Sequence, residues 1–131
     1  MKRPSDRHPP RVLVVDDSAD IRGMWRLWLT YWGFGVDDAG DGSEAVRKAY
    51  ADPPDLILMD LWMPIVDGLE AIRLLRADAR TAHVPIIAMS AQCPQIAAAR
   101  EAGAETFLLK PCDPDALLEH IQDALHKGRT P

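Results

Sequence analysis

The chain has 131 residues, of which 47% are apolar, and a formal net charge of −5 with a pI near 5.2. One domain of this length holds a core without disulfides or structural metals, and the acidic balance argues against nucleic acid as a direct partner, because phosphate binding calls for a basic face. No window approaches the roughly 18 uninterrupted apolar residues of a membrane span, so we expect a soluble, cytoplasmic protein without membrane insertion.

The chain begins with a short basic segment that contains Lys2, Arg3, Arg7 and several prolines. This segment has no apolar run and therefore does not match a secretory signal. We predict that residues 1–10 are a disordered basic arm, that residues 11–127 form one folded domain, and that residues 128–131 are a frayed tail. Cys93 and Cys112 have no Cys or His partner at ligand spacing, which predicts neither a disulfide nor a zinc site.

Short apolar runs alternate with longer segments of helical spacing over the rest of the chain. The runs are rich in branched residues and largely lack alternation, which is typical of parallel strands buried on both faces. The predicted strands are 12–15, 34–37, 56–59, 84–89 and 106–109; the second is weakly apolar and suits an edge position. The predicted helices are 18–32, 43–51, 69–77, 95–102 and 114–127. Ser18 and Ser43 are expected to cap helices, and Gly33 and Gly103 to end them.

The order of strand then helix, repeated five times, predicts an α/β fold of the doubly wound type. Such folds have an open parallel sheet with helices on both faces, and their ligands lie beyond the carboxyl ends of the strands. Five polar residues follow strands directly and are therefore expected at that end of the sheet: Asp16, Asp17, Asp60, Ser90 and Lys110.

The three acids predict a cation site. Two carboxylates about 4 Å apart repel by roughly 4 kcal/mol at an effective dielectric of 20, so a cluster of them needs a cation or a proton. Mg²⁺ takes one or two carboxylates and keeps waters, and the chain has no twelve-residue calcium loop. Taken alone, Asp17 is equally explained as a helix cap, Ser90 as a turn former and Lys110 as a surface charge. Pro111 is a candidate cis peptide that would fix Lys110.

The first predicted helix is apolar over most of its circumference. Its core-facing stripe at helical spacing comprises Ile21, Trp25, Trp28, Leu29 and Trp32. Met24, Leu27 and Tyr31 extend beyond this stripe, and Arg22, Arg26 and Thr30 form the polar strip. Core packing explains the tryptophans, whereas the overflow is a candidate docking patch.

Together these residues resemble the receiver domain of two-component response regulators, over roughly residues 11–127. The resemblance is to a chemotaxis-regulator-like single domain, which implies a flavodoxin-like (βα)5 fold with strand order 2-1-3-4-5. It makes Asp60, within Met59-Asp60-Leu61-Trp62-Met63-Pro64, the phosphoacceptor. It further implies an acidic pair (Asp16 and Asp17), a switch hydroxyl (Ser90), a switch aromatic (Phe107) and an active-site lysine (Lys110 before Pro111).

The resemblance implies a signalling domain, rather than a dedicated enzyme, that transfers phosphoryl to Asp60 from a sensor histidine kinase or a histidine phosphotransfer protein. Mg²⁺, or Mn²⁺ in its place, would be held by Asp17, Asp60 and the backbone carbonyl of Trp62, with Asp16 acting through water. Trp62 and Gln92 are expected to slow self-dephosphorylation.

The implied output surface is the fourth helix, fifth strand and fifth helix, approximately 95–127, which would bind a downstream protein. The resemblance also allows a phosphorylation-dependent dimer.

Three other interpretations stay open beside a stand-alone receiver. The same domain could serve in a phosphorelay as shuttle or sink, or be a piece excised from a hybrid kinase. It could also be an unphosphorylated pseudo-receiver, although the complete set of polar residues counts against this. A hydrolytic enzyme is disfavoured, because no G-x-S-x-G, P-loop or H-E-x-x-H motif occurs.

Overall fold

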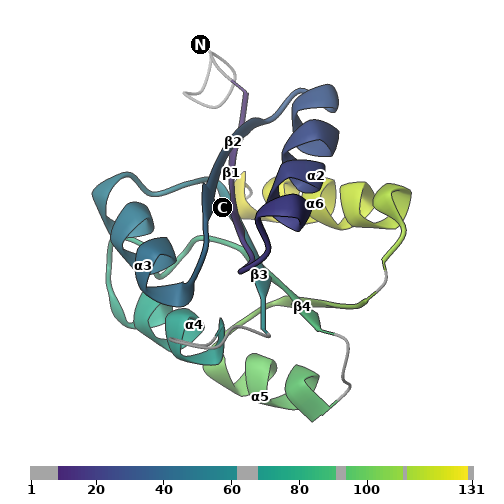
Figure 1. Ribbon diagram of the computed structural model, residues 1–131. Helices are drawn as coiled ribbons and strands as arrows, with labels where there is room; N and C mark the ends of the chain where they lie inside the picture. Colours follow the sequence, from purple (N-terminus) through teal and green to yellow (C-terminus); the bar gives the residue numbers. More distant parts are fainter. Residues whose placement is uncertain (1–8, 62–67, 91–93, 111, 130–131) are drawn as a thin grey trace.

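The computed structural model describes residues 9–61, 68–90, 94–110 and 112–129. Five parallel strands form one sheet in the order β2-β1-β3-β4-β5, with helices on both of its faces (Figure 1). The strands are β1 (Arg11–Val15), β2 (Gly35–Ala39), β3 (Leu56–Asp60), β4 (Ile86–Ser90) and β5 (Thr106–Leu109). The helices are α2 (Ala19–Tyr31), α3 (Gly42–Ala51), α4 (Gly68–Ala77), α5 (Pro94–Ala102) and α6 (Pro114–Arg129). The predicted fold class and strand order are confirmed.

Each predicted strand and helix is present, with ends displaced by at most two residues. The second strand lies at an edge of the sheet, as its weak apolar character predicted. Helix α6 continues to Arg129, so residues 128 and 129 of the predicted tail are helical. In the described part of the chain no helix is long and apolar enough to span a membrane.

Alternating side chains of the strands build a separate core on each face of the sheet. Leu13, Val15, Ile57 and Met59 point to the face that α3, α4 and α5 cover. Their sequence neighbours, such as Val14 and Leu58, point to the other face, where α2 and α6 pack. Both faces of the central strands are therefore apolar, which is why these strands read as continuous apolar runs rather than alternating ones.

Polar side chains and glycines set the helix ends. The Ser18 hydroxyl accepts a hydrogen bond from the Ile21 N–H at 3.3 Å, which confirms this cap. The predicted Ser43 cap is wrong: Asp41 caps α3 by accepting from the Glu44 N–H at 2.8 Å. Asp and Ser are about equally favoured as N-cap residues, so the identity of the side chain alone does not show which of the two begins the helix. Gly33 and Gly103 end their helices with φ of 96° and 119°, in the region that favours glycine.

Helix α2 is less buried than its tryptophan stripe predicted. Trp25 and Leu29 are buried, but Trp28 is 38% exposed and stacks on Trp32 with ring centroids 5.5 Å apart. The flank of α2 next to β2 is held by two arginines that bind Asp38, and much of the remaining apolar surface of α2 faces solvent. Leu27 and Tyr31 are 75% and 82% exposed, and Met24 is also exposed, as expected for the overflow of the stripe.

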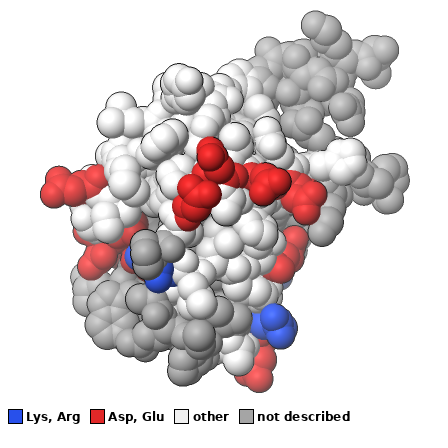
Figure 2. All heavy atoms as spheres, turned by 90° about the vertical axis from the view of Figure 1, so that its right-hand side faces the viewer, with Lys and Arg blue, Asp and Glu red and all other residues white. Residues whose placement is uncertain are grey.

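The side of the molecule seen at the right of Figure 1, where α2 and α6 lie, carries several acidic and few basic side chains (Figure 2). Three exposed acids of α6 recur at every fourth residue and share one flank of that helix: Asp115, Glu119 and Asp123. The apolar flank of α2 therefore belongs to an acidic side of the domain.

Gly68 is required where the chain enters α4. A Cβ atom there would lie 2.6 Å from the Asp60 carbonyl oxygen and 2.9 Å from the Leu61 Cα, both of them backbone atoms. We expect Gly68→Ala to lower the free energy of unfolding by about 1–3 kcal/mol, as overpacking does. The control is Gly23→Ala in α2, where a Cβ meets nothing within 4 Å and helix propensity should add up to about 1 kcal/mol. Urea unfolding measures both, and equal effects would contradict the close approach at Gly68.

Candidate functional site

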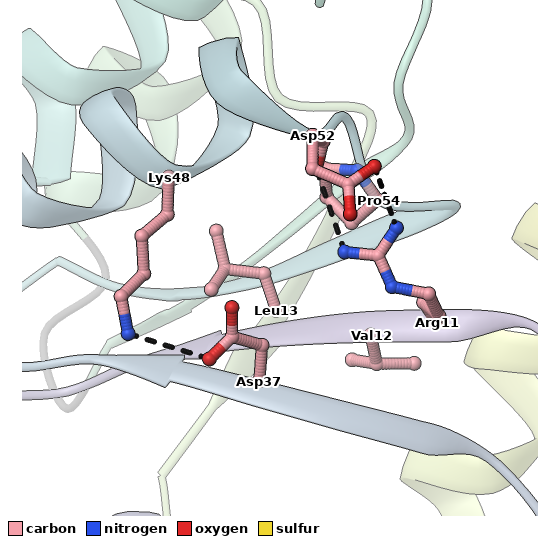
Figure 3. A pocket seen from close by; sticks show the side chains of 7 residues that line it. All are labelled: Arg11, Val12, Leu13, Asp37, Lys48, Asp52 and Pro54. Atoms are coloured by element: carbon pink, nitrogen blue, oxygen red, sulfur yellow. Dashed lines mark hydrogen bonds and ion pairs between the residues drawn. The ribbon is translucent and has the colours of Figure 1, made fainter.

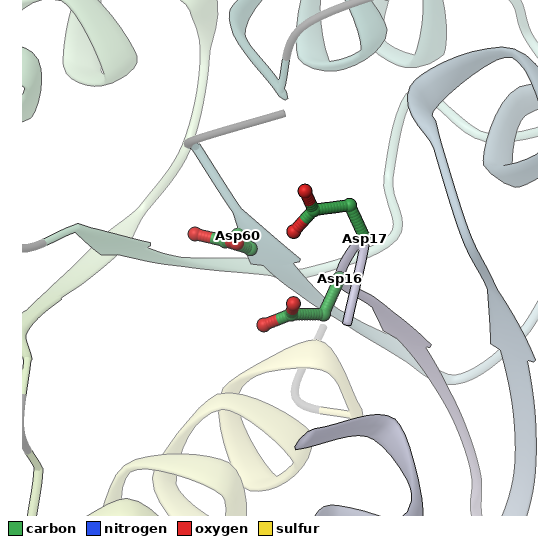
Figure 4. Close-up of side chains that lie close together, drawn as sticks. All are labelled: Asp16, Asp17 and Asp60. Carbon is green, nitrogen blue, oxygen red and sulfur yellow. The ribbon is translucent and has the colours of Figure 1, made fainter. Parts of the chain in front are cut away.

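Three carboxylates meet at the carboxyl end of the sheet (Figure 4). Asp16 and Asp17 directly follow β1, and Asp60 is the last residue of β3, which pairs with β1. One oxygen from each of the three lies within 4.8 Å of the others. Asp16 and Asp60 are only 1% and 2% exposed, whereas Asp17 is exposed to solvent. The predicted acidic cluster is therefore formed, with two of its charges buried.

Lys110 brings one positive charge to this cluster from the end of β5. Its Nζ donates to Asp60 Oδ1 at 3.0 Å and lies 3.7 Å from Asp16 Oδ2. The Lys110 N–H also donates to the Ser90 carbonyl at 2.8 Å, which fixes the backbone that carries the lysine to the end of β4. One ammonium faces two buried carboxylates, so the charge of the cluster is only partly balanced.

Asp16 fits a cation ligand better than a structural carboxylate. Its Oδ1 accepts from the Ser18 N–H at 2.9 Å, but its buried Oδ2 has no hydrogen-bond partner within the described residues. Burial raises the pKa of the Asp16 carboxyl above its usual value, and the charges of Asp60 and Asp17 add to the rise. The Ser18 hydrogen bond and Lys110 oppose it. A buried carboxylate oxygen that has no hydrogen-bond partner among the described residues and lies beside other carboxylates suits a hard divalent ion such as Mg²⁺.

The structure also describes Ser90 and Phe107, two further residues that the sequence analysis singled out. Ser90 ends β4 and is buried, one residue beyond Met89, which pairs with Asp60. Phe107 in β5 is half-buried against the core on the α3–α5 face, and the Arg100 guanidinium lies 5.1 Å from its ring centroid. Trp62, Gln92 and Pro111, which the sequence analysis also singled out, lie outside the described residues.

An apolar cavity of about 540 Å³ adjoins the cluster on the α2 side. Its lining comprises Ile21, Met24, Trp25, Met89, Lys110, Cys112 and Pro114. Sequence reasoning missed it, because the cavity exists only where α2 meets the segment after β5. Met24 lines the cavity and is also exposed, so the cavity continues into the apolar flank of α2.

A second polar cluster, under α3, is structural. The cavity that Arg11, Asp37, Lys48 and Asp52 help to line measures about 10 Å³, which leaves at most enough room for one water (Figure 3). Its charges are paired, Lys48 with Asp37 at 3.3 Å and Arg11 with Asp52 at 3.1 Å. These ion pairs leave no space for a ligand larger than a water molecule.

The sequence model of the response regulator receiver domain matches residues 12–122. The chain therefore belongs to the response regulator receiver family, which is a class of signalling modules.

Its curated relatives are longer proteins. The chain is 39% identical over 118 residues to the CAI-1 autoinducer sensor kinase/phosphatase CqsS of Vibrio cholerae, covering 88% of this chain and 17% of that protein. It is 39% identical over 102 residues to the transcriptional regulatory protein PrrA of Mycobacterium tuberculosis, covering 78% and 44% respectively. The chain thus spans less than half the length of either relative.

Solved receivers superpose closely on the chain. The chemotaxis protein CheY4 of Vibrio cholerae has a TM-score of 0.83 and 32% identity, covering 88% of this chain and 98% of that one. The receiver domain of a sensor histidine kinase from Pseudomonas aeruginosa has a TM-score of 0.85 and 31% identity, covering 90% and 98%. That structure is described with a magnesium ion coordinated in its active-site cleft.

Asp16→Asn should stabilise the metal-free domain. The amide oxygen can still accept from the Ser18 N–H, and only the long 3.7 Å contact with the Lys110 Nζ is lost. A buried charge whose second oxygen has no hydrogen-bond partner among the described residues is removed, a change worth about 1–3 kcal/mol. Because the folded-state pKa of Asp16 is raised, its ionisation begins to disfavour folding above the ordinary pKa of the unfolded carboxyl, and the full penalty is reached above the raised folded-state pKa. The gain in stability should therefore be present at pH 7 and vanish as the pH falls toward 3.8, the ordinary pKa of this carboxyl. Thermal unfolding between pH 3.5 and pH 7, roughly bracketing that transition, tests this; a loss of stability at pH 7 would contradict it.

Proposed function

We propose that this chain is a phosphoacceptor receiver in which Asp60 takes a phosphoryl group from a phosphohistidine of a partner protein. One observation carries the proposal: the Asp60 carboxylate is buried at the end of a central strand, within reach of two further acids and 3.0 Å from the Lys110 Nζ. A structural acid has no need of this combination, whereas phosphoryl transfer requires a nucleophile among groups that balance phosphate charge.

The reaction is an in-line displacement at phosphorus. An oxygen of Asp60 forms the new O–P bond while the N–P bond of the phosphohistidine breaks, and the bonding electron pair stays on the imidazole nitrogen. Lys110 already contacts Asp60, so its ammonium is placed to meet charge on the transferred group. Because strands β3, β4 and β5 are hydrogen-bonded side by side, nucleophile and lysine are positioned before the partner arrives.

The metal of the proposed site is Mg²⁺, which Mn²⁺ can replace. Asp17, Asp60 and the backbone carbonyl of Trp62 would hold it directly, and Asp16 through water. When bound, it supplies positive charge beside the phosphoryl oxygens. The described acids support this assignment through the close approach of their oxygens and through the buried Asp16 oxygen that has no hydrogen-bond partner among the described residues.

Phosphorylation would be converted into a change of surface through Ser90 and Phe107. The Ser90 hydroxyl would hydrogen-bond the acyl phosphate, and Phe107 would then turn inward, away from its contact with Arg100. Shifting a two-state element from 1:99 to 99:1 takes roughly 5.5 kcal/mol, which several charge-assisted hydrogen bonds can supply. The altered surface is formed by α5, β5 and α6, where we place the downstream protein partner and a phosphorylation-dependent dimer.

The phosphodonor is a sensor histidine kinase or a histidine phosphotransfer protein that docks on α2. Two features support this placement: the exposed apolar flank of α2 and the cavity beside Lys110, which Met24 joins into one surface. A donor seated there has its phosphohistidine at the same end of the sheet as Asp60. We further propose that the protein acts in the cytoplasm and that Trp62 and Gln92 slow loss of the phosphoryl group.

A role within a phosphorelay or a hybrid kinase is the second candidate. Its support is the similarity to CqsS, of which the chain spans 17%. The chemistry at Asp60 is the same in both roles, and they differ in which proteins supply and read the phosphoryl group. An unphosphorylated pseudo-receiver is the third, and it predicts no adduct.

Incubation with acetyl phosphate and Mg²⁺ tests the reaction. We expect one phosphoryl adduct by intact mass in the parent and none in Asp60→Asn, because the amide is not a nucleophile for phosphorus. Asp123→Asn, an exposed change on α6, is the matched control and should form the adduct. Absence of an adduct from the parent under all metal conditions would favour the pseudo-receiver.

Docking on α2 predicts a selective effect on the donor. Leu27→Ser with Tyr31→Ser should slow transfer from a phosphorylated donor about tenfold, as expected when an apolar contact worth roughly 1.4 kcal/mol is lost. Phosphorylation by acetyl phosphate should not change. Leu74→Ser on α4 removes an exposed leucine elsewhere and serves as control. Equal transfer rates in all three proteins would exclude this docking surface.

A further inference from the structure

Arg22 links the loop that carries two of the acids to the edge strand of the sheet. Its Nη1 donates to the Asp16 carbonyl at 2.7 Å, and its Nε donates to Asp38 Oδ2 at 2.9 Å. The side chain is 20% exposed, so water competes weakly for these bonds. Arg22 lies in the first turns of α2, next to the acids in space, but its side chain contacts the backbone of Asp16 rather than its carboxylate.

The anchor of this link is rigid. Asp38 is part of β2, where it pairs with Val14 of β1, and a second arginine, Arg26, binds its other oxygen at 3.3 Å. Arg26 also donates to the Val36 carbonyl at 3.1 Å, and within the described part of the chain it makes no hydrogen bond or ion pair with Asp16. The Asp38 carboxylate is therefore fixed both by the sheet and by a second cation. Because Arg22 binds both this carboxylate and the Asp16 carbonyl, it holds the loop after β1 in a fixed place relative to β2.

The remaining space around Arg22 is closely fitted. A Cβ added at Gly40 would lie 3.3 Å from Arg22 Nη1, so the glycine leaves room for the guanidinium beside the backbone. Ala39, the residue before Gly40, also holds Asp16: its carbonyl accepts a hydrogen bond from the Asp16 N–H at 3.2 Å. Both sides of the Asp16 backbone are thus held by groups that belong to, or are anchored on, the end of β2.

From this geometry we propose that Arg22 is a positioning residue for the cation site. The peptide unit is planar, so fixing the Asp16 carbonyl also fixes the nitrogen and Cα of Asp17. Asp17 is exposed, and burial does not hold its carboxylate; its place beside Asp16 and Asp60 depends on its backbone. The inference rests on the proposed Mg²⁺ site and names a residue outside the ligand set on which that site depends.

Removal of Arg22 should change the affinity for Mg²⁺ in opposite directions, depending on whether its charge or its hold on the loop matters more. Arg22 is a cation, so removing it should strengthen Mg²⁺ binding if charge alone mattered. If its role is to hold the loop, removal should weaken binding. Arg26 is the matched control, because it sits one helical turn away, carries the same charge and shares Asp38, but does not bind Asp16.

The experiment is an NMR titration of the full chain with MgCl₂ at constant ionic strength, in the parent, Arg22→Met, Arg26→Met and Arg22→Lys. We expect a dissociation constant about tenfold higher in Arg22→Met, at the low end of the range for groups that orient metal ligands. Arg26→Met should stay within about twofold of the parent by the same reasoning. Arg22→Lys should be intermediate, because an ammonium keeps the charge but lacks the planar fork that reaches Asp38 and Asp16 together.

Thermal midpoints separate positioning from general stability. Both methionine variants lose a bond to Asp38, so their midpoints should fall by similar amounts while only Arg22→Met loses affinity. Equal dissociation constants in the two variants, or tighter binding in Arg22→Met, would overturn the proposal. If Arg22→Met does not fold, an Arg22→Lys constant equal to that of the parent would overturn it. A parent that does not bind Mg²⁺ at all would instead refute the proposed site itself.

Discussion

Repulsion between carboxylates at the carboxyl end of the sheet is the constraint on which the rest of the molecule depends. Asp16 and Asp60 are buried with oxygens within 4.8 Å of each other and of Asp17. Lys110 offsets part of this charge at 3.0 Å, but a single ammonium cannot neutralise three acids. The fold thus keeps a site that is unfavourable in isolation, and the Asp16 oxygen without a hydrogen-bond partner among the described residues marks where a cation gains most.

Such a site lasts only if its members cannot move apart. Each acid lies at or directly after the end of a strand whose two faces are packed. Hydrogen bonds between neighbouring strands continue to this end of the sheet, where the Leu61 N–H donates to the Met89 carbonyl and the Lys110 N–H donates to the Ser90 carbonyl. The part least supported by packing is the loop after β1. There Ser18, Ala39 and Arg22 each make a hydrogen bond to Asp16, and together they replace the burial that Asp17 lacks.

The sequence predicts most of this arrangement because its signals are local. An apolar run followed by an acid places Asp60 at a strand end without knowledge of the fold, and alternation of strands and helices brings Asp16, Ser90 and Lys110 to the same end. What failed needed tertiary information. Helical spacing put Trp28 in the core, but it cannot show how far neighbouring elements cover α2. Arg22 belonged to the polar strip, and its contact with Asp16 requires β2 to lie beside β1.

The charged character of β2 has a consequence for association between chains. An edge strand exposes unpaired backbone groups that invite another strand, and charged residues oppose this. Asp37 and Asp38 lie on that edge with cations drawn around them, Lys48 at Asp37 and two arginines at Asp38. A second chain adding a strand there would have to displace or bury these ion pairs. The opposite edge strand, β5, ends in the exposed Leu109 instead. The β2 edge is therefore better protected against pairing with a strand of another chain than the β5 edge is.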